Sequence, residues 1–225
     1  MLNAAGIELA SANTTSDGSY SLSGNVDDTF RLLVRAELGL PNSINTRVFD
    51  NTRSNALYTL FADVDVISNK MTQNLNAGSG WGDSSYTEAR STGPFSILDV
   101  IYQAQQLMLS VDSEVTFPAL TVNWSTLNSS ADGNISGGDI GTSFYLENNL
   151  YILGRANADT DEYDKAVIAH EWGHYFEDNL SRSDSVGGSH GQGDILHPSV
   201  ALSEGFGTAL AAMILDNSVC IDTFG

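Results

Sequence analysis

The sequence predicts an α+β fold in which a small N-terminal β-sandwich precedes a mixed sheet with helices that carry the candidate site. Short β-type segments separated by turn residues fill positions 1–68, a polar stretch rich in Gly, Ser and Asn covers 69–93, and helical patterns dominate from 94 onward. With 225 residues, 41% of them hydrophobic, the chain can bury a substantial core. We therefore expect a β-sandwich-like module at 1–68, a linker or long loop at 69–93 and a metal-binding core at 94–225.

The first 68 residues contain four segments in which apolar and polar side chains partly alternate, at 6–12, 19–24, 29–38 and 56–66. The Ser-Asp-Gly-Ser sequence at 16–19 joins the first two and is typical of a β-hairpin turn. Short strands joined by turns predict the small sandwich.

The segment 94–110 predicts a core helix, because Pro94 suits a first turn and Leu98, Ile101 and Met108 recur at helical spacing. Three short β-rich segments follow at 119–124, 142–146 and 150–154, and these should form the sheet beside the site. A polar loop at 128–139 has half the pattern of a calcium-binding loop, although a plain turn is the simpler interpretation.

The candidate site begins with the sequence Val-Ile-Ala-His-Glu-Trp-Gly-His-Tyr-Phe-Glu-Asp-Asn at 167–179. His170 and His174 are four positions apart, so on a helix both imidazoles leave the same face and can hold one cation, for which zinc suits best. Glu171 lies about 100° around the helix axis, beside the cation, where its carboxylate can take a proton from a metal-activated water. The motif therefore predicts zinc ligands at His170 and His174 and a general base at Glu171.

Catalytic zinc needs a third protein ligand, and the sequence offers three candidates. Glu204 lies in a second predicted helix at 198–216, whose small residues allow close approach to the first. His190 and His197 lie in the Gly- and Ser-rich loop before it. A rigid helix favours Glu204, which leaves His190 and His197 as candidate contacts to the substrate or its oxyanion.

The His-Glu-x-x-His motif followed by Ser-Glu-Gly at 203–205 resembles the gluzincin group of zinc metallopeptidases, which includes the thermolysin-like enzymes. The resemblance implies a zincin-like fold with zinc ligands His170, His174 and Glu204 and a further C-terminal subdomain, and Thr208 stands where that group has an Asp. The runs around these motifs are also similar to secreted metallopeptidase-like proteins of bacteria. Residues 15–22 resemble carboxypeptidase-regulatory-like β-sandwich modules, which accompany secreted peptidases, although an ordinary hairpin explains them too.

The acidic residues 159–162 precede the first motif helix. Their simplest role is to cap its amide groups and complement its dipole, and calcium binding is the second interpretation. Nine Lys and Arg against 28 Asp and Glu give a net charge of −19, which argues against nucleic acid and anionic membranes as partners. We expect no transmembrane segment, and the composition suggests an exported bacterial protein, secreted, at the cell surface or periplasmic.

Two functions remain. In the first, the chain is the core of a zinc metallopeptidase that hydrolyses peptide bonds in protein or peptide substrates, although this part alone would be inactive if the C-terminal subdomain is missing. In the second, it is a non-catalytic surface-binding module with a structural metal site. Because a structural zinc site has four protein ligands and no use for a base, Glu171 favours the enzyme.

Overall fold

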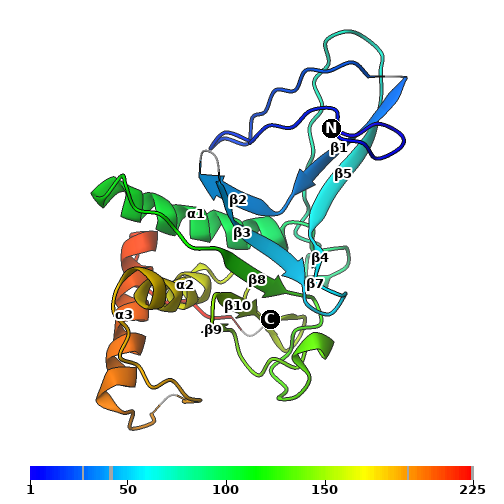
Figure 1. The fold of residues 1–225 in the computed structure, drawn as a ribbon. Coiled ribbons are helices and arrows are strands. Elements are labelled where there is room, and N and C mark those ends of the chain that lie inside the picture. Colours follow the sequence, from blue (N-terminus) through cyan, green and yellow to red (C-terminus); the bar gives the residue numbers. More distant parts are fainter. Residues whose placement is uncertain (27, 41–42, 192, 224–225) are drawn as a thin grey trace.

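The computed structural model describes residues 1–26, 28–40, 43–191 and 193–223 and has a mixed α+β fold (Figure 1). Its largest sheet has the strand order β2-β3-β8-β10-β9, with β4 pairing on β3. The strands β3, β8 and β10 run parallel, whereas β2, β4 and β9 are antiparallel to their neighbours. These strands are β2 (Glu37–Leu40), β3 (Ser43–Asp50), β4 (Ala56–Leu57), β8 (Leu120–Trp124), β9 (Phe144–Leu146) and β10 (Asn149–Ile152).

The smaller sheets each contain two strands. They pair β1 (Thr29–Arg35) with β5 (Thr59–Asp65), β6 (Trp81–Gly82) with β7 (Ser85–Tyr86), and β11 (Gly154–Arg155) with β12 (Asp159–Thr160). The β1–β5 ladder extends away from the large sheet (Figure 1), and Ala36 connects the two through backbone hydrogen bonds to Tyr58 and Val48. Strands from the first 68 residues therefore contribute both to a small sheet and to the large sheet. The division at 69–93 stays a prediction.

Three α-helices in the described residues complete the fold: α1 (Gly93–Val111), α2 (Lys165–Leu180) and α3 (Pro198–Leu215). The core joins the sheet to all three, and its fully buried side chains include Val48, Val122, Ile101 and Trp172. α1 and α2 contact the large sheet, and α3 packs on α2 (Figure 1). By length and composition alone α3 could also span a membrane, but it lies against the motif helix as a helix of a folded domain does.

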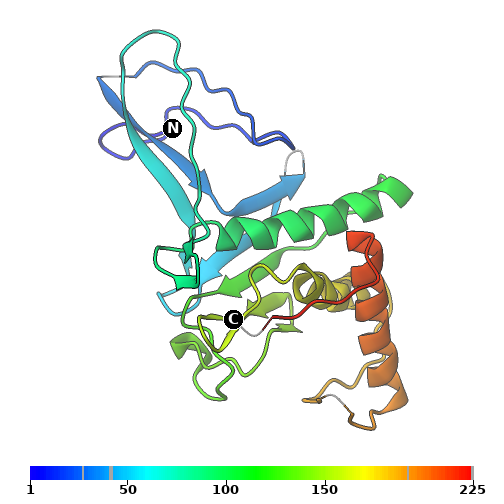
Figure 2. The ribbon, with the colours of Figure 1, turned by 180° about the vertical axis from the view of Figure 1, so that it is seen from behind.

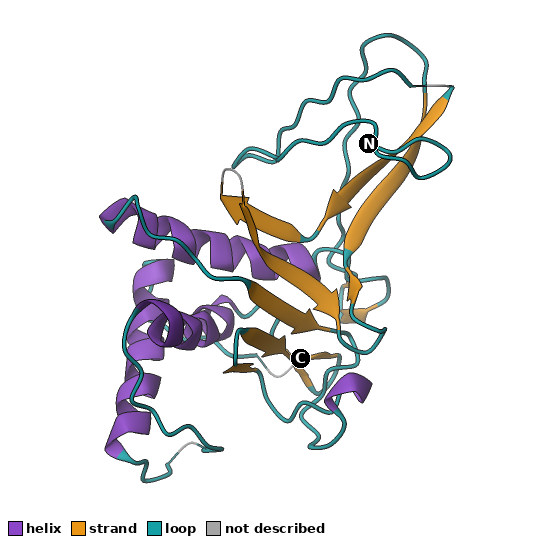
Figure 3. Cartoon of the chain, in the orientation of Figure 1, coloured by secondary structure: helices purple, strands orange, loops and turns teal. Residues whose placement is uncertain are grey.

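Several expected elements form, and two strands do not. The helices around 94–110 and 198–216 and the strands at 119–124, 142–146 and 150–154 are confirmed as α1, α3, β8, β9 and β10. The strands expected at 6–12 and 19–24 are wrong: Figure 3 draws this region as loop, with one isolated bridge between Leu2 and Glu8. The turn between them does form, with Gly18 at φ 79°. Its arms remain mostly exposed, so no buried face stabilises a ladder.

The central strand β3 is missing from the sequence-based prediction. Its residues Asn45, Thr46 and Arg47 interrupt the apolar pattern, yet Asn45 and Thr46 are buried between β2 and β8. A strand covered on both sides tolerates such residues only where the tertiary structure provides hydrogen-bond partners, and Asn45 contacts Thr46 and Gln105 of α1. Local sequence does not report partners so distant along the chain.

Candidate metal centre

The helix α2 presents two opposite faces. Its buried face carries Ile168, Ala169 and Trp172, and Trp172 packs on the rings of Phe117 and Tyr175. The other face carries His170 and His174, whose ring centroids lie 4.8 Å apart with an interplanar angle of 83°. The helical spacing thus places both imidazoles side by side, as the sequence predicts.

The helix α3 brings Glu204 to these histidines through a close contact between glycines. A Cβ atom built on Gly173 of α2 would lie 3.0 Å from the Cα of Gly207, and a Cβ on Gly207 would lie 3.1 Å from the His170 ring. Such distances are below normal van der Waals contact, so a side chain at either position would need its neighbour to shift by a few tenths of an ångström. The approach places a carboxylate of one helix against the imidazoles of the other.

The three side chains form a compact group. His170 Nε2 lies 3.1 Å from Glu204 Oε2 and 3.1 Å from His174 Nε2, and His174 Nε2 lies 3.4 Å from Glu204 Oε1. Ligands about 2.0–2.1 Å from a tetrahedral zinc ion would be about 3.3 Å from one another. The two imidazole nitrogens have the spacing of two ligands of one zinc ion, and a carboxylate oxygen of Glu204 lies close to each of them, so the group could hold a metal ion.

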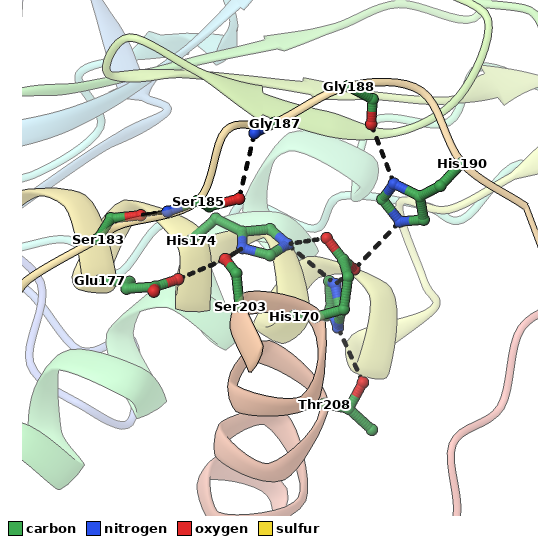
Figure 4. Close-up of polar contacts among 11 residues, drawn as sticks. His170, His174, Glu177, Ser183, Ser185, Gly187, Gly188, His190, Ser203 and Thr208 are labelled. Carbon is green, nitrogen blue, oxygen red and sulfur yellow. Dashed lines mark hydrogen bonds and ion pairs between the residues drawn. The ribbon is translucent and has the colours of Figure 1, made fainter. Parts of the chain in front are cut away.

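Hydrogen bonds behind the imidazoles direct their Nε2 atoms toward this centre. His174 Nδ1 lies 3.2 Å from Ser203 Oγ, which donates to Glu177 at 2.5 Å, and His170 Nδ1 lies 3.3 Å from Thr208 Oγ1 (Figure 4). We assign the Nδ1–H tautomer to His174, because the Ser203 proton points to Glu177 and Ser203 can then only accept. The Nε2 lone pair of His174 is consequently free for a metal, and the Thr208 hydroxyl is able to accept from His170 Nδ1 in the same way.

The charge states of the two imidazoles also favour metal binding. Burial, followed by the proximity of His174, lowers the pKa of His170, and burial lowers the pKa of His174 despite the opposing influence of Glu204. Neutral imidazole is the form that binds metals. Two neutral nitrogens and one carboxylate, with no sulfur, form a donor set that zinc accepts. The residues present therefore fit the ion that the motif predicts.

Glu171 is half-buried beside this group on α2. Burial, followed by the proximity of Glu204, raises the pKa of Glu171 to about 8, while the backbone of Tyr145 in β9 opposes the shift. A cation held by the neighbouring ligands would favour the ionised carboxylate. A carboxylate with a raised pKa in a partly enclosed site is suited to accept and return a proton.

The loop at 181–197 carries His190 over the group. Successive serine side chains turn its backbone: Ser183 Oγ accepts from the Ser185 amide and Ser185 Oγ from the Gly187 amide (Figure 4). His190 Nδ1 lies 3.0 Å from the Gly188 carbonyl oxygen, and its Nε2 lies 3.4 Å from Glu204 Oε2. The Gly188 carbonyl and Glu204 together raise the pKa of His190.

His197 has a different environment. Its Nδ1 accepts a hydrogen bond from the Ser199 amide at 3.3 Å and lies 2.8 Å from Ser199 Oγ, so the side chain caps the N-terminus of α3. Of the two histidines in the loop, the structure brings His190 to Glu204 and uses His197 as a helix cap. The sequence did not predict this difference, because it depends on how the loop folds back over α3.

The acidic residues before α2 do not form the expected cap. Asp164 is the N-cap residue but makes no side-chain bond to the helix amides, and its carboxylate accepts from the backbone and hydroxyl of Thr223. Glu162 forms a buried ion pair with Arg90 at 2.5 Å. The capping prediction is wrong because tertiary donors reach these carboxylates before the amides of the first turn do.

The contacts behind the candidate metal ligands were not predicted either. Ser203 and Glu177 are buried, and neither is among the ligands that the two motifs predict. Ser203 nevertheless lies within the Ser-Glu-Gly motif at 203–205. Helical spacing would have suggested Glu177, which lies three residues after His174 on the same helix, whereas Ser203 directly precedes Glu204. Comparison of the chain with protein-family models, with curated proteins and with solved structures finds no match.

Proposed function

We propose that this chain is the metal-binding core of a zinc-dependent peptidase of the gluzincin type. The observation that carries the proposal is the close grouping of His170, His174 and Glu204, with Glu171 next to His170 in the sequence and a hydroxyl group within hydrogen-bond distance of the Nδ1 atom of each imidazole. The resemblance of the two helix motifs to gluzincins supports it. Export from a bacterial cell and a further C-terminal subdomain remain predictions from the sequence.

Zinc bound at these ligands would lower the pKa of a water molecule and polarise a carbonyl group. Glu171 would accept a proton from the attacking water while the water oxygen forms a bond to the peptide carbonyl carbon. The same carboxyl group would then deliver the proton to the leaving nitrogen as the C–N bond breaks. His190, whose Nε2 lies 3.4 Å from Glu204, could donate a hydrogen bond to the developing oxyanion, whereas His197 caps α3.

The edge strand β9 supports a peptide as substrate. Within the described strands it pairs only with β10, and it contacts α2 next to the motif. An extended peptide can add to such an edge by backbone hydrogen bonds, which would hold a scissile bond beside Glu171. Because backbone pairing does not depend on side chains, it fits a substrate class of proteins or peptides in general.

The first prediction tests the role of Glu171. Glu171→Gln should retain zinc, since the residue is not a ligand, and should lower hydrolysis of a denatured protein mixture by about 10²-fold or more, since the amide cannot accept a proton. Zinc content is measured by elemental analysis and hydrolysis by release of peptides. Glu204→Ala is the matched comparison and should lose zinc. Where the parent hydrolyses the mixture, equal hydrolysis by Glu171→Gln would end the assignment.

One observation favours the second function, a non-catalytic module. Because His190 Nε2 lies 3.4 Å from Glu204, a small movement of the loop could supply a fourth ligand, as in structural zinc sites. The second prediction separates the two functions with His190→Ala. In a peptidase the variant keeps its zinc affinity and loses kcat, whereas in a structural site it loses zinc affinity. Titration against a competing chelator decides between them, with His197→Ala as the control on the same loop.

A further inference from the structure

A second group of metal-capable side chains lies away from the histidines. Asp159 in β12 and Asp161 just after it precede α2, and Asp222 lies in the segment that follows α3. Their nearest carboxylate oxygens all lie within 4.8 Å of one another. Asp161 is 3% exposed, whereas Asp222 is exposed to solvent.

Buried oxygens in this group have no hydrogen-bond partner. Asp161 Oδ2 accepts from Ser143 at 2.5 Å, but Asp161 Oδ1 is buried without a partner, and so is Asp159 Oδ1. A buried carboxylate oxygen without a partner costs folding free energy, so such atoms usually face a donor or a cation. Asp161 Oδ1 therefore marks a place for a hydrogen-bond donor or a cation.

No basic side chain fills that place. Among the ion pairs formed by the described residues, none involves Asp159, Asp161 or Asp222. Burial, followed by the proximity of Asp222, raises the pKa of Asp159, and burial raises the pKa of Asp161 to about 7 against the Ser143 hydrogen bond. The fold thus places three carboxylates together, which costs folding free energy, and a bound cation would offset that cost.

We propose that Asp159, Asp161 and Asp222 bind a calcium ion. A set of ligands made only of oxygen selects hard cations. Oxygens bound to one calcium ion at about 2.3–2.6 Å are at most about 5 Å apart, which the 4.8 Å limit of this group satisfies. Calcium accepts three carboxylates and completes its shell with water, which can enter from the exposed side at Asp222. Magnesium usually keeps several waters and takes only one or two carboxylates.

The site would connect the two helices of the histidine centre. Figure 2 shows the red segment after α3 returning toward the segment before α2, and the Asp164 carboxylate accepts from the Thr223 amide at 2.7 Å. Calcium bound by the three Asp residues would connect the segment after α3, which carries Glu204, to the segment before α2, which carries His170 and His174. It would therefore stabilise the relative position of α2 and α3 without touching the residues of the candidate zinc centre.

The experiment uses the full chain, loaded with zinc, in buffer freed of calcium by a chelating resin. Calcium chloride is added while calorimetry measures binding and thermal unfolding measures Tm, with magnesium chloride at equal concentration as the comparison. We expect one calcium per chain and a rise in Tm of about 5–10 °C at a 100-fold excess over Kd. Absence of calcium binding, or an equal rise with magnesium, would overturn the proposal.

Two variants locate the ion. Asp222→Asn changes an exposed residue, so it should fold and lose most of the calcium-dependent rise in Tm. Asp161→Asn should lose the rise as well, yet unfold at the parent temperature or above it without calcium, because a buried charge is removed. The exposed Asp65→Asn on β5 is the control and should keep the full rise. A full rise in Asp222→Asn, or an equal loss in Asp65→Asn, would contradict the site, while zinc content reports separately on the histidine centre.

Discussion

At the scale of single residues, the direction of each imidazole is decided by what its Nδ1 atom contacts. Ser203 and Thr208 on α3 face the Nδ1 atoms of the two histidines on α2. The helix that carries Glu204 thus also carries the hydroxyl groups that orient both candidate histidine ligands of α2. Thr208, which replaces an Asp of the gluzincin pattern, can still accept a hydrogen bond, although it lacks the negative charge.

The third prediction concerns Ser203. Ser203→Ala removes the acceptor of His174 Nδ1 and leaves the buried Glu177 carboxylate without its hydroxyl donor, so zinc affinity should fall about 10–100-fold. Competition with a chelator of known affinity measures the change. Ser199→Ala, at the start of the same helix, controls for loss of helix stability. Equal losses in the two variants would show that Ser203 acts only through α3.

At the scale of elements, the packing of α3 on α2 determines whether Glu204 reaches the histidines. The contact is made by glycines, and the sequence predicted that small residues in α3 would allow it. The structure distinguishes among them: Gly207 touches the His170 ring, whereas a Cβ on Gly205 would meet nothing within 4 Å. Two glycines in one helix turn therefore have different functions.

The fourth prediction uses this pair of glycines. Gly207→Ala should push His170 or α3 aside by a few tenths of an ångström, destabilise the fold by about 1–3 kcal/mol and weaken zinc binding. Gly205→Ala should be neutral or stabilise the fold by up to about 1 kcal/mol, since alanine favours the helix and the site is open. Urea unfolding and zinc titration of both variants provide the measurement. Similar effects in the two would mean that helix propensity, rather than close packing, dominates.

At the scale of the whole molecule, the large sheet connects parts of the chain that the sequence assigns to different domains. β3 pairs in parallel with β8, and Val48 of β3 is fully buried in the core shared with α1 and α2. A strand in the middle of a sheet cannot leave without exposing its neighbours. The polar stretch at 69–93 therefore joins segments that share a sheet on both sides of it.

The fifth prediction follows from that sheet. Thermal or urea unfolding of the full chain should give one cooperative transition by circular dichroism and by tryptophan fluorescence, because Trp124 of β8 and the strands before residue 68 lose their packing together. Limited proteolysis at 69–93 followed by the same measurement serves as the control. Two separate transitions in the intact chain would instead support two independent domains.

The sequence by itself determined the features that depend on spacing along one element. Helical periodicity placed His170, Glu171 and His174 and located α1 and α3, and short β-rich segments located β8, β9 and β10. These features need only the geometry of one helix or strand, which nearby residues specify.

The tertiary structure alone decided the features that depend on contacts between distant segments. It placed β3 in the centre of the sheet, separated the role of His190 from that of His197, and gathered Asp222 with Asp159 and Asp161. It also turned the acidic residues before α2 away from the helix amides. Such contacts arise when burial and hydrogen bonding across the fold outweigh local preference, and no short window of sequence contains both partners.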